Sequence, residues 1–217
     1  AVVIPPRPLP PGNASLTQIL PARGVDGRFM TANSGISGDR AFWQLKIALN
    51  VAAIGCRGAE EATLVSAYNN IIKAHAKQIR STEKTVIADL GKETRTNGIA
   101  ARDKLSTQLF NYFAQPPAQR AFCARANEVA QLVSSTPSAQ VIPQAPAQLA
   151  QLDQPFVDFY EAYAKYQADV ADWDAKYAPP PPVLTAPRGS PPPPPRRRFR
   201  DRPGRPSAAT ETARIAG

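Results

Sequence analysis

The distribution of proline constrains this chain more than any other feature of its sequence. Twelve of the 24 prolines lie in residues 178–217 and six in residues 1–21, so the long middle part contains only six. Proline removes a backbone N–H and clashes with the preceding helical turn, so it disfavours helices and central strands at both ends. We therefore expect one compact domain over residues 37–177, an extended Pro/Gly-rich segment over residues 1–36, and a disordered tail over residues 178–217.

Apolar residues in the middle part recur at spacings of three and four, the period of amphipathic helices. The pattern predicts helices over about residues 37–55, 59–90, 99–114, 118–134 and 153–177. In the first of these, apolar side chains cover most of the helix circumference, which is typical of a central, buried helix. The fold class that follows is all-α, a single bundle of about five helices.

Two stretches leave the helix boundaries open. The second helical stretch is either one long helix or two helices with a break near Ser81-Thr82. Residues 136–147 are rich in Pro, Gln and Ala and predict a linker, so we expect the last helix to begin at Asp153 or Gln154. The aromatic residues of that helix recur at helical spacings, which favours core packing over a ligand platform.

Cys56 and Cys123 are the only cysteines, and 67 positions separate them. Such a pair suits one long-range disulfide better than a metal site, which needs clustered ligands. Closing this loop is expected to stabilise the fold by roughly 3 to 4.5 kcal/mol. The alternative is two buried thiols in a reducing cytoplasm. The chain opens on Ala1-Val2-Val3, as after removal of a leader, so we expect an exported, mature protein.

Sequence motifs for catalysis or cofactor binding are missing, so we expect no catalytic residue, no cofactor and no metal. The single histidine, His75, lies between two alanines on the polar half of a helical stretch, which predicts an exposed side chain. A glycan hydrolase needs only one or two carboxylates, so five helix-borne acids stay open as candidates. They are Glu60, Glu61, Glu83, Asp89 and Glu93.

Positive charge is concentrated in the tail. Residues 41–177 carry a net charge of +1, whereas residues 178–217 carry +6 of the total of +9. The arginines that cluster around Phe199 are Arg196, Arg197, Arg198, Arg200, Arg202 and Arg205. Such a cluster favours an anionic partner, which can be an envelope polymer, lipid head groups or nucleic acid. The alternative is a tail that only keeps the protein soluble.

Two proline-rich segments resemble ligands of SH3 domains. Arg7-Pro8-Leu9-Pro10-Pro11 is similar to the core of one ligand class, although Gly12-Asn13 follow it. Pro191, Pro194 and Arg196 resemble the opposite orientation. The resemblance implies a protein partner for the Pro-rich segments.

Together these features favour a non-enzymatic structural or interaction protein of the bacterial cell envelope, periplasmic or secreted. The alanine-rich helices and the tail in which arginine is the only cation suggest a GC-rich bacterial genome. In this hypothesis the bundle is an anchor and the stiff, basic tail reaches an anionic partner. The alternatives are a nucleic-acid-associated protein that binds through the Arg-rich tail, and a cell-wall glycan hydrolase that uses a helix-borne carboxylate.

Overall fold

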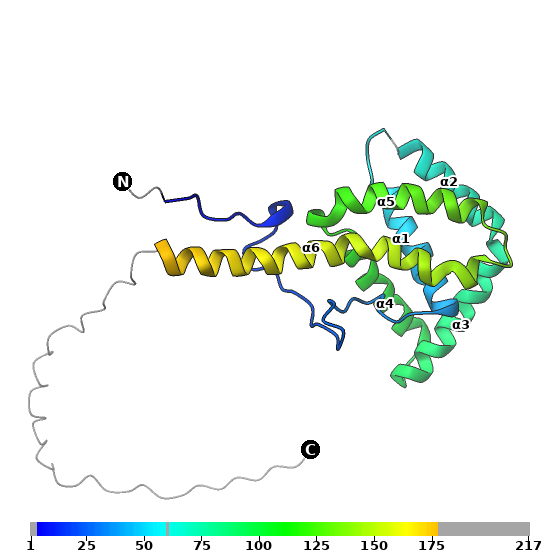
Figure 1. Ribbon diagram of the computed structural model, residues 1–217. Coiled ribbons are helices and arrows are strands. Elements are labelled where there is room, and N and C mark those ends of the chain that lie inside the picture. The colour runs from blue at the N-terminus through cyan, green and yellow to red at the C-terminus, as the bar shows by residue number, and fades with distance from the viewer. Residues whose placement is uncertain (1–3, 60, 178–217) are drawn as a thin grey trace, which may run out of the picture. The chain divides into compact units, whose positions relative to one another are not determined.

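The computed structural model describes residues 4–59 and 61–177, and within them the chain is all-helical, as the sequence predicts. Figure 1 shows the helices packed as a bundle. They are α1 (Gly38–Gly55), α2 (Glu61–Ala74), α3 (Ala76–Thr94), α4 (Gly98–Phe113), α5 (Pro116–Ser135) and α6 (Val141–Tyr177). The described residues contain six helices rather than about five, because the predicted second helix is two.

Helix α1 is the centre of the bundle, as its pattern predicts. It packs against each of the other five helices, and ten of its residues are buried. The largest of the buried side chains are Phe42, Trp43, Leu45 and Leu49. Its end at Gly55, with Cys56 as the C-terminal cap, agrees with the predicted stop. Contact with five helices explains why α1 is apolar around most of its circumference, although it also buries the polar side chain of Gln44.

The break in the second helical stretch lies at His75 and not near Ser81-Thr82, so the predicted position was wrong. His75 has φ −109° and ψ 23°, outside the helical region, while its N–H still donates to Ile71 and its carbonyl accepts from Ile79. Thr82 is instead buried within α3, where its hydroxyl donates to Asp39 at 2.9 Å. Tertiary hydrogen bonds therefore hold the chain straight where local propensity predicts a break.

Helix α6 begins at Val141, so the predicted linker over residues 136–147 and the predicted start at Asp153 were wrong. Pro143 is the third residue of α6, where a backbone N–H has no intrahelical partner in any case. Pro146 and Pro155 lie further in, and each removes one hydrogen bond from the helix. Burial outweighs that loss, because the first four turns of α6 place a continuous apolar stripe against the bundle. Its fully buried members are Val141, Ala145, Leu149, Leu152 and Phe156.

An aromatic cluster connects α4, α5 and α6. The Phe156 ring lies 5.7 Å from the Phe113 ring, 5.3 Å from the Phe122 ring and 4.6 Å from the Tyr112 ring, measured between centroids. The three phenylalanines have essentially no exposed surface. This agrees with the expectation that the first aromatic residues of α6 pack in a core.

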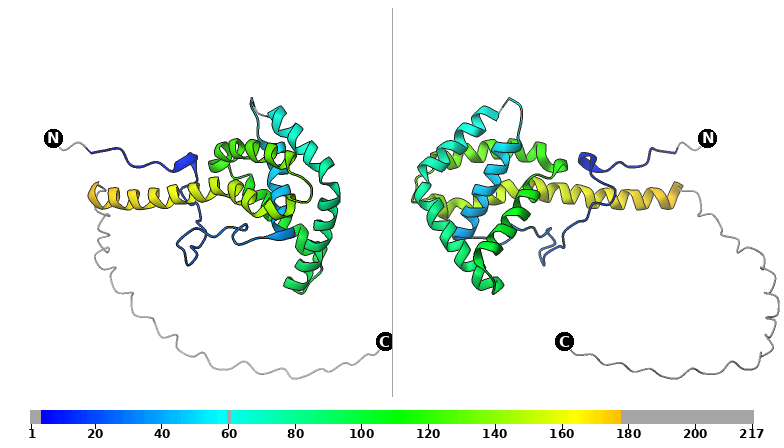
Figure 2. Two further views of the ribbon diagram at one scale, coloured as in Figure 1. Left: turned by 45° about the vertical axis from the view of Figure 1, so that its right-hand side comes forward. Right: turned by 180° about the vertical axis from the view of Figure 1, so that it is seen from behind.

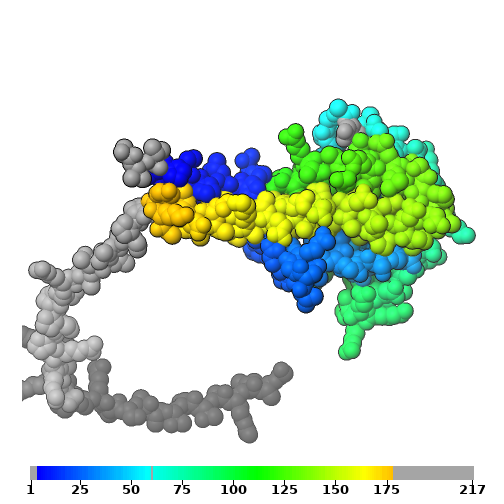
Figure 3. Space-filling model, viewed as in Figure 1, coloured from blue at the N-terminus to red at the C-terminus, as the bar shows by residue number. Residues whose placement is uncertain are grey.

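The N-terminal segment (residues 4–36) contains a short 3₁₀ turn at Pro11–Asn13 and an isolated antiparallel bridge between Arg23 and Phe29. It lies along the C-terminal part of α6 and crosses that helix from one side to the other (Figures 1 and 2). The space-filling view shows its residues in direct contact with α6 (Figure 3). Its direction is opposite to that of α6, since Arg7 contacts Asp174 whereas Asn33 contacts Asp153. Contacts of Arg7, Arg23 and Asn33 with α6 are spread along this length.

Candidate functional site

The structure places Cys56 and Cys123 in a disulfide that joins the end of α1 to α5, with the two Cα atoms 5.6 Å apart. That Cα separation is within the range of ordinary disulfides. The two cysteines are thus a disulfide-capable pair, in agreement with the pairing expected from their spacing. The bridge crosslinks the central helix to its neighbour at the point where α1 ends.

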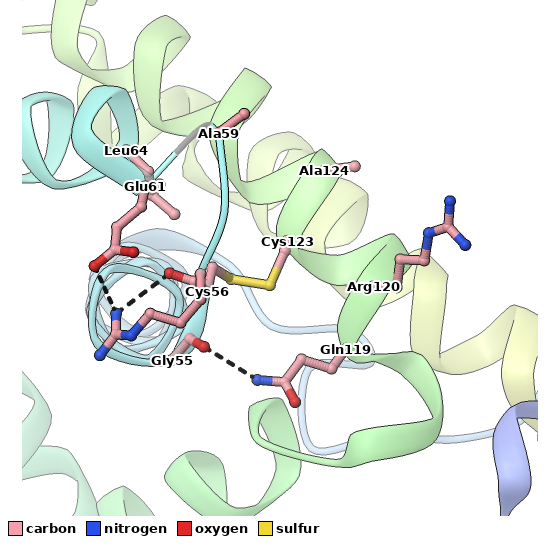
Figure 4. Close-up of a pocket in the computed structure, with 10 residues that line it drawn as sticks. Gly55, Cys56, Ala59, Glu61, Leu64, Gln119, Arg120, Cys123 and Ala124 are labelled. Atoms are coloured by element: carbon pink, nitrogen blue, oxygen red, sulfur yellow. Dashed lines mark hydrogen bonds and ion pairs between the residues drawn. A yellow bond between two sulfur atoms is a disulfide. The ribbon is translucent and has the colours of Figure 1, made fainter.

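A surface pocket of about 750 Å³ lies beside this disulfide (Figure 4). Its polar groups largely satisfy one another. Arg57 pairs with Glu61 at 3.2 Å and donates to the Cys56 carbonyl at 3.3 Å, while Gln119 donates to the Gly55 carbonyl at 3.4 Å. Arg120 points away from the disulfide. The pocket is therefore a hollow in the surface without a convergent acid, base or nucleophile.

His75 is 1% exposed, so the prediction of an exposed helical histidine was wrong. The ring Nε2 lies 3.2 Å from the Val133 carbonyl, to which it donates, and Nδ1 lies 3.3 Å from the Ser138 hydroxyl. The Phe42 ring packs edge-on against it at 6.4 Å. With both ring nitrogens hydrogen-bonded in the core, this histidine is a structural contact at the junction of α2 and α3.

Four of the five candidate carboxylates are described, and each lies beside a cation. Glu61 pairs with Arg57, Glu93 with Arg40 and Asp89 with Lys92, at 3.2, 3.0 and 3.6 Å. Glu83 lies between Arg102, at 3.0 Å, and the indole N–H of Trp43, which donates to it at 2.7 Å. Glu60 lies outside the described residues. These surroundings are those of ion pairs on helix surfaces.

Asp153 is a buried acceptor that sequence reasoning missed, because the pattern around it predicts only a helix start. Its side chain accepts hydrogen bonds from the Thr31 hydroxyl, the Asn33 amide and the Tyr112 hydroxyl, at 2.8, 2.5 and 2.8 Å. Burial, together with the neighbouring Asp153, raises the pKa of Tyr112, so its hydroxyl stays protonated and keeps donating. The cluster fixes the end of the N-terminal segment to α4 and α6.

Further along α6, two bidentate ion pairs hold the N-terminal segment. Arg23 donates to both oxygens of Glu161, at 2.7 and 2.8 Å, and its guanidinium lies 3.9 Å from the Phe29 ring centre. Arg7 donates to both oxygens of Asp174, at 3.0 and 2.8 Å. These hydrogen bonds lower the pKa of Glu161 and of Asp174. Both carboxylates are therefore charged down to lower pH than usual, which keeps the two pairs intact.

The C-terminal end of α6 contacts proline as well as arginine. The Trp173 indole N–H donates to the Pro5 carbonyl at 2.8 Å, one residue before the aspartate that binds Arg7. The Tyr177 ring lies 5.7 Å from the Trp173 ring and continues the same aromatic surface. We call Trp173 and Asp174 the Pro-Pro-Arg site, after the tripeptide Pro5-Pro6-Arg7 that they bind. A resemblance of the Arg7–Pro11 segment to SH3 ligands was the only sequence signal for it.

The remaining predicted site residues lie outside the described part of the chain. They are Arg196, Arg197, Arg198, Arg200, Arg202 and Arg205, together with the rest of the tail expected to be disordered. Within residues 4–59 and 61–177, no three His, Cys, Asp or Glu side chains group as metal ligands do. Among those same residues, no helix combines the length and apolar character that a membrane span requires.

Comparison with family models, with curated proteins and with solved structures gave no match for this chain. The class of the protein therefore follows from its own fold, which is an all-helical bundle with a disulfide-capable cysteine pair.

Proposed function

We propose that this chain is a non-enzymatic interaction protein of the bacterial cell envelope, periplasmic or secreted. Its helical bundle anchors a basic, proline-rich tail that binds an anionic partner. The observation that carries the proposal is the separation of charge from fold: residues 41–177 are close to neutral at +1, whereas the tail carries +6. A charge confined to a chain end suits long-range attraction to a surface or polymer.

The cysteine pair supports the compartment. A disulfide between the central helix and α5 persists in an oxidising environment and is rare in the cytoplasm. Counting free thiols under denaturing conditions, on protein from its native source, tests this part. We expect zero free thiols before reduction and two after it. Two free thiols before reduction would contradict the envelope assignment and favour the nucleic-acid-associated alternative.

Binding to vesicles tests the partner. We expect the full chain to bind phosphatidylglycerol vesicles at low salt and to leave phosphatidylcholine vesicles unbound. Each arginine near an anionic surface contributes about 1 kcal/mol, so changing the six clustered tail arginines to serine is expected to weaken binding by roughly a thousandfold or more. The matched control changes the same six residues to lysine, which keeps the charge.

The outcomes separate the mechanisms. Retained binding in the lysine variant, loss in the serine variant and a steep decrease with salt support electrostatic attraction through the tail. Equal binding of the serine variant would overturn the proposal. Preference for duplex DNA over vesicles at equal salt, with both thiols free, would instead favour the nucleic-acid-associated protein.

A further inference from the structure

The Pro-Pro-Arg site binds its segment by chemistry that suits a polyproline II strand. Such a strand has no internal hydrogen bonds, so its carbonyls are available to donors such as an indole N–H. The Trp173 N–H binds the Pro5 carbonyl, and Asp174 binds Arg7 in a bidentate pair two residues later. Pro10, further along the segment, has φ −66° and ψ 141°, which is polyproline II geometry. Aromatic-lined surfaces are a recurrent means of recognising such strands.

The same tripeptide occurs a second time in this chain. Pro5-Pro6-Arg7 is repeated as Pro194-Pro195-Arg196, and no other Pro-Pro-Arg is present. The second copy ends a run of five prolines, so it is predisposed to the conformation that the site binds. Two more arginines, Arg197 and Arg198, follow it directly.

We propose that the Pro-Pro-Arg site takes either copy, and that Pro194-Pro195-Arg196 of the tail replaces Pro5-Pro6-Arg7 at Trp173 and Asp174. The site then controls whether the tail arginines are free to bind a partner. In a docked tail, Arg196 is paired with Asp174 and its charge is neutralised. This inference goes beyond the proposed function and does not depend on the compartment or on the tail's partner.

Chain length and direction permit the exchange. Sixteen residues lie between Tyr177 and Pro194. At about 3.1 Å per residue they extend about 50 Å, ample for a return to a site one helical turn before the end of α6. A tail that leaves α6 and turns back runs opposite to that helix. The bound N-terminal segment has the same direction, so the tail copy meets Trp173 and Asp174 in the same order.

Charge favours the tail copy. From Asp158 to its end at Tyr177, α6 carries five acidic residues against two lysines, Lys165 and Lys176. The tail copy presents Arg197 and Arg198 after its tripeptide, whereas the N-terminal copy continues with Pro8 and Leu9. More cations near the same acidic helix increase the attraction.

The test follows the two indole N–H signals of the full chain by nitrogen-15 NMR. The signal of Trp173 is assigned with Trp173→Phe, and that of buried Trp43 reports that the bundle is intact. In Arg7→Ser the N-terminal copy is disabled and the tail copy remains. A second variant adds Pro194→Gly and Pro195→Gly, which disables the tail copy but keeps every tail arginine. We expect the Trp173 signal to differ between the two variants, with the Trp43 signal unchanged.

A peptide of residues 191–200 is then added to the second variant. It is expected to move the Trp173 signal to its position in Arg7→Ser, in a saturable titration. Asp174→Asn in the same chain, or glycines at 194 and 195 of the peptide, should raise the half-saturating concentration at least fivefold. Identical Trp173 signals in the two variants, or equal binding of the glycine peptide, would overturn the proposal, the latter because charge alone then suffices.

Discussion

The two halves of α6 show how one helix is stabilised in two different ways. Residues 141–160 pack inside the bundle, where the apolar stripe is covered by other helices. Residues 161–177 contact the N-terminal segment on one side, through Arg7, Ser15 and Arg23. The first half depends mainly on apolar burial, whereas the second combines the buried Tyr163 ring with hydrogen bonds and ion pairs between residues more than 130 positions apart. We therefore expect the halves to differ in what destabilises them.

The largest effect is expected in the first half of α6, which packs inside the bundle. Phe156→Ala leaves a cavity between α4, α5 and α6 and should lower the free energy of unfolding by about 3–5 kcal/mol, measured by denaturant titration. Tyr166→Ala is the matched change in the other half, where the side chain is 9% exposed and an extended segment can close over the gap. Tyr166→Ala should lower the free energy of unfolding by less than half as much as Phe156→Ala. Equal losses would remove the distinction between the halves.

A smaller effect is expected at Asp153, where the N-terminal segment meets the first half of α6. Asp153→Asn turns an amide toward the donors of Thr31, Asn33 and Tyr112, so at least one donor is left unpaired. The free energy of unfolding should decrease by about 1–3 kcal/mol. Asp158→Asn is the control, because that exposed carboxylate accepts only from Gln154 and should change stability by less than about 0.5 kcal/mol. Similar losses in both variants would contradict the structural role of Asp153.

In the second half we expect local rather than global effects. Tyr163→Phe removes the hydroxyl that donates to the Ser15 carbonyl at 2.8 Å, a contact of about 1 kcal/mol. Hydrogen exchange at the amide of Ala14 should accelerate roughly fivefold, in proportion to that loss. The denaturation midpoint of the bundle should stay nearly constant. A large shift of that midpoint would show that the two halves unfold as one unit.

The smallest effect is expected from mild acid. Hydrogen bonds from Arg23 and Arg7 lower the pKa of Glu161 and Asp174, so these pairs stabilise the N-terminal segment above the unfolded carboxyl pKa values. That stability is lost as pH falls below about 4 through the lowered pKa values. Cleavage within residues 4–36 by an acid-active protease, which cuts beside apolar and aromatic residues, should accelerate below that pH. In the double variant Glu161→Gln and Asp174→Asn, the acceleration of proteolysis in acid should be absent.

The helices inside the bundle could be predicted from local patterns. Apolar residues at spacings of three and four marked α1, α4 and α5, and α1 was predicted as central because Phe42, Leu45 and Leu49 share it with a second apolar stripe. Pro116 and Pro117 predicted the end of the helix before them, and α5 begins with them instead of at residue 118. Two cysteines predicted one crosslink. Each of these features depends on a pattern within a few helical turns or on a residue type that has one common use.

The start of α6 and the burial of His75 were decided by tertiary structure. Pro143 and Pro146 indicate a linker in any local analysis, and only packing against α1 and α5 compensates for the lost hydrogen bond. His75 is polar and lies between alanines, and only the arrival of Val133 and Ser138 from distant positions makes a buried site for it. No local sequence pattern predicts either of these tertiary contacts.

The Pro-Pro-Arg site follows the same division. The sequence by itself determined that proline and arginine recur together at both ends and that α6 ends in aromatic and acidic residues. Only the tertiary structure decided that Arg7 meets Asp174, 167 positions away. Helical periodicity reports which face of a segment avoids water, whereas the choice of partner depends on a geometry that forms only when the whole bundle is assembled.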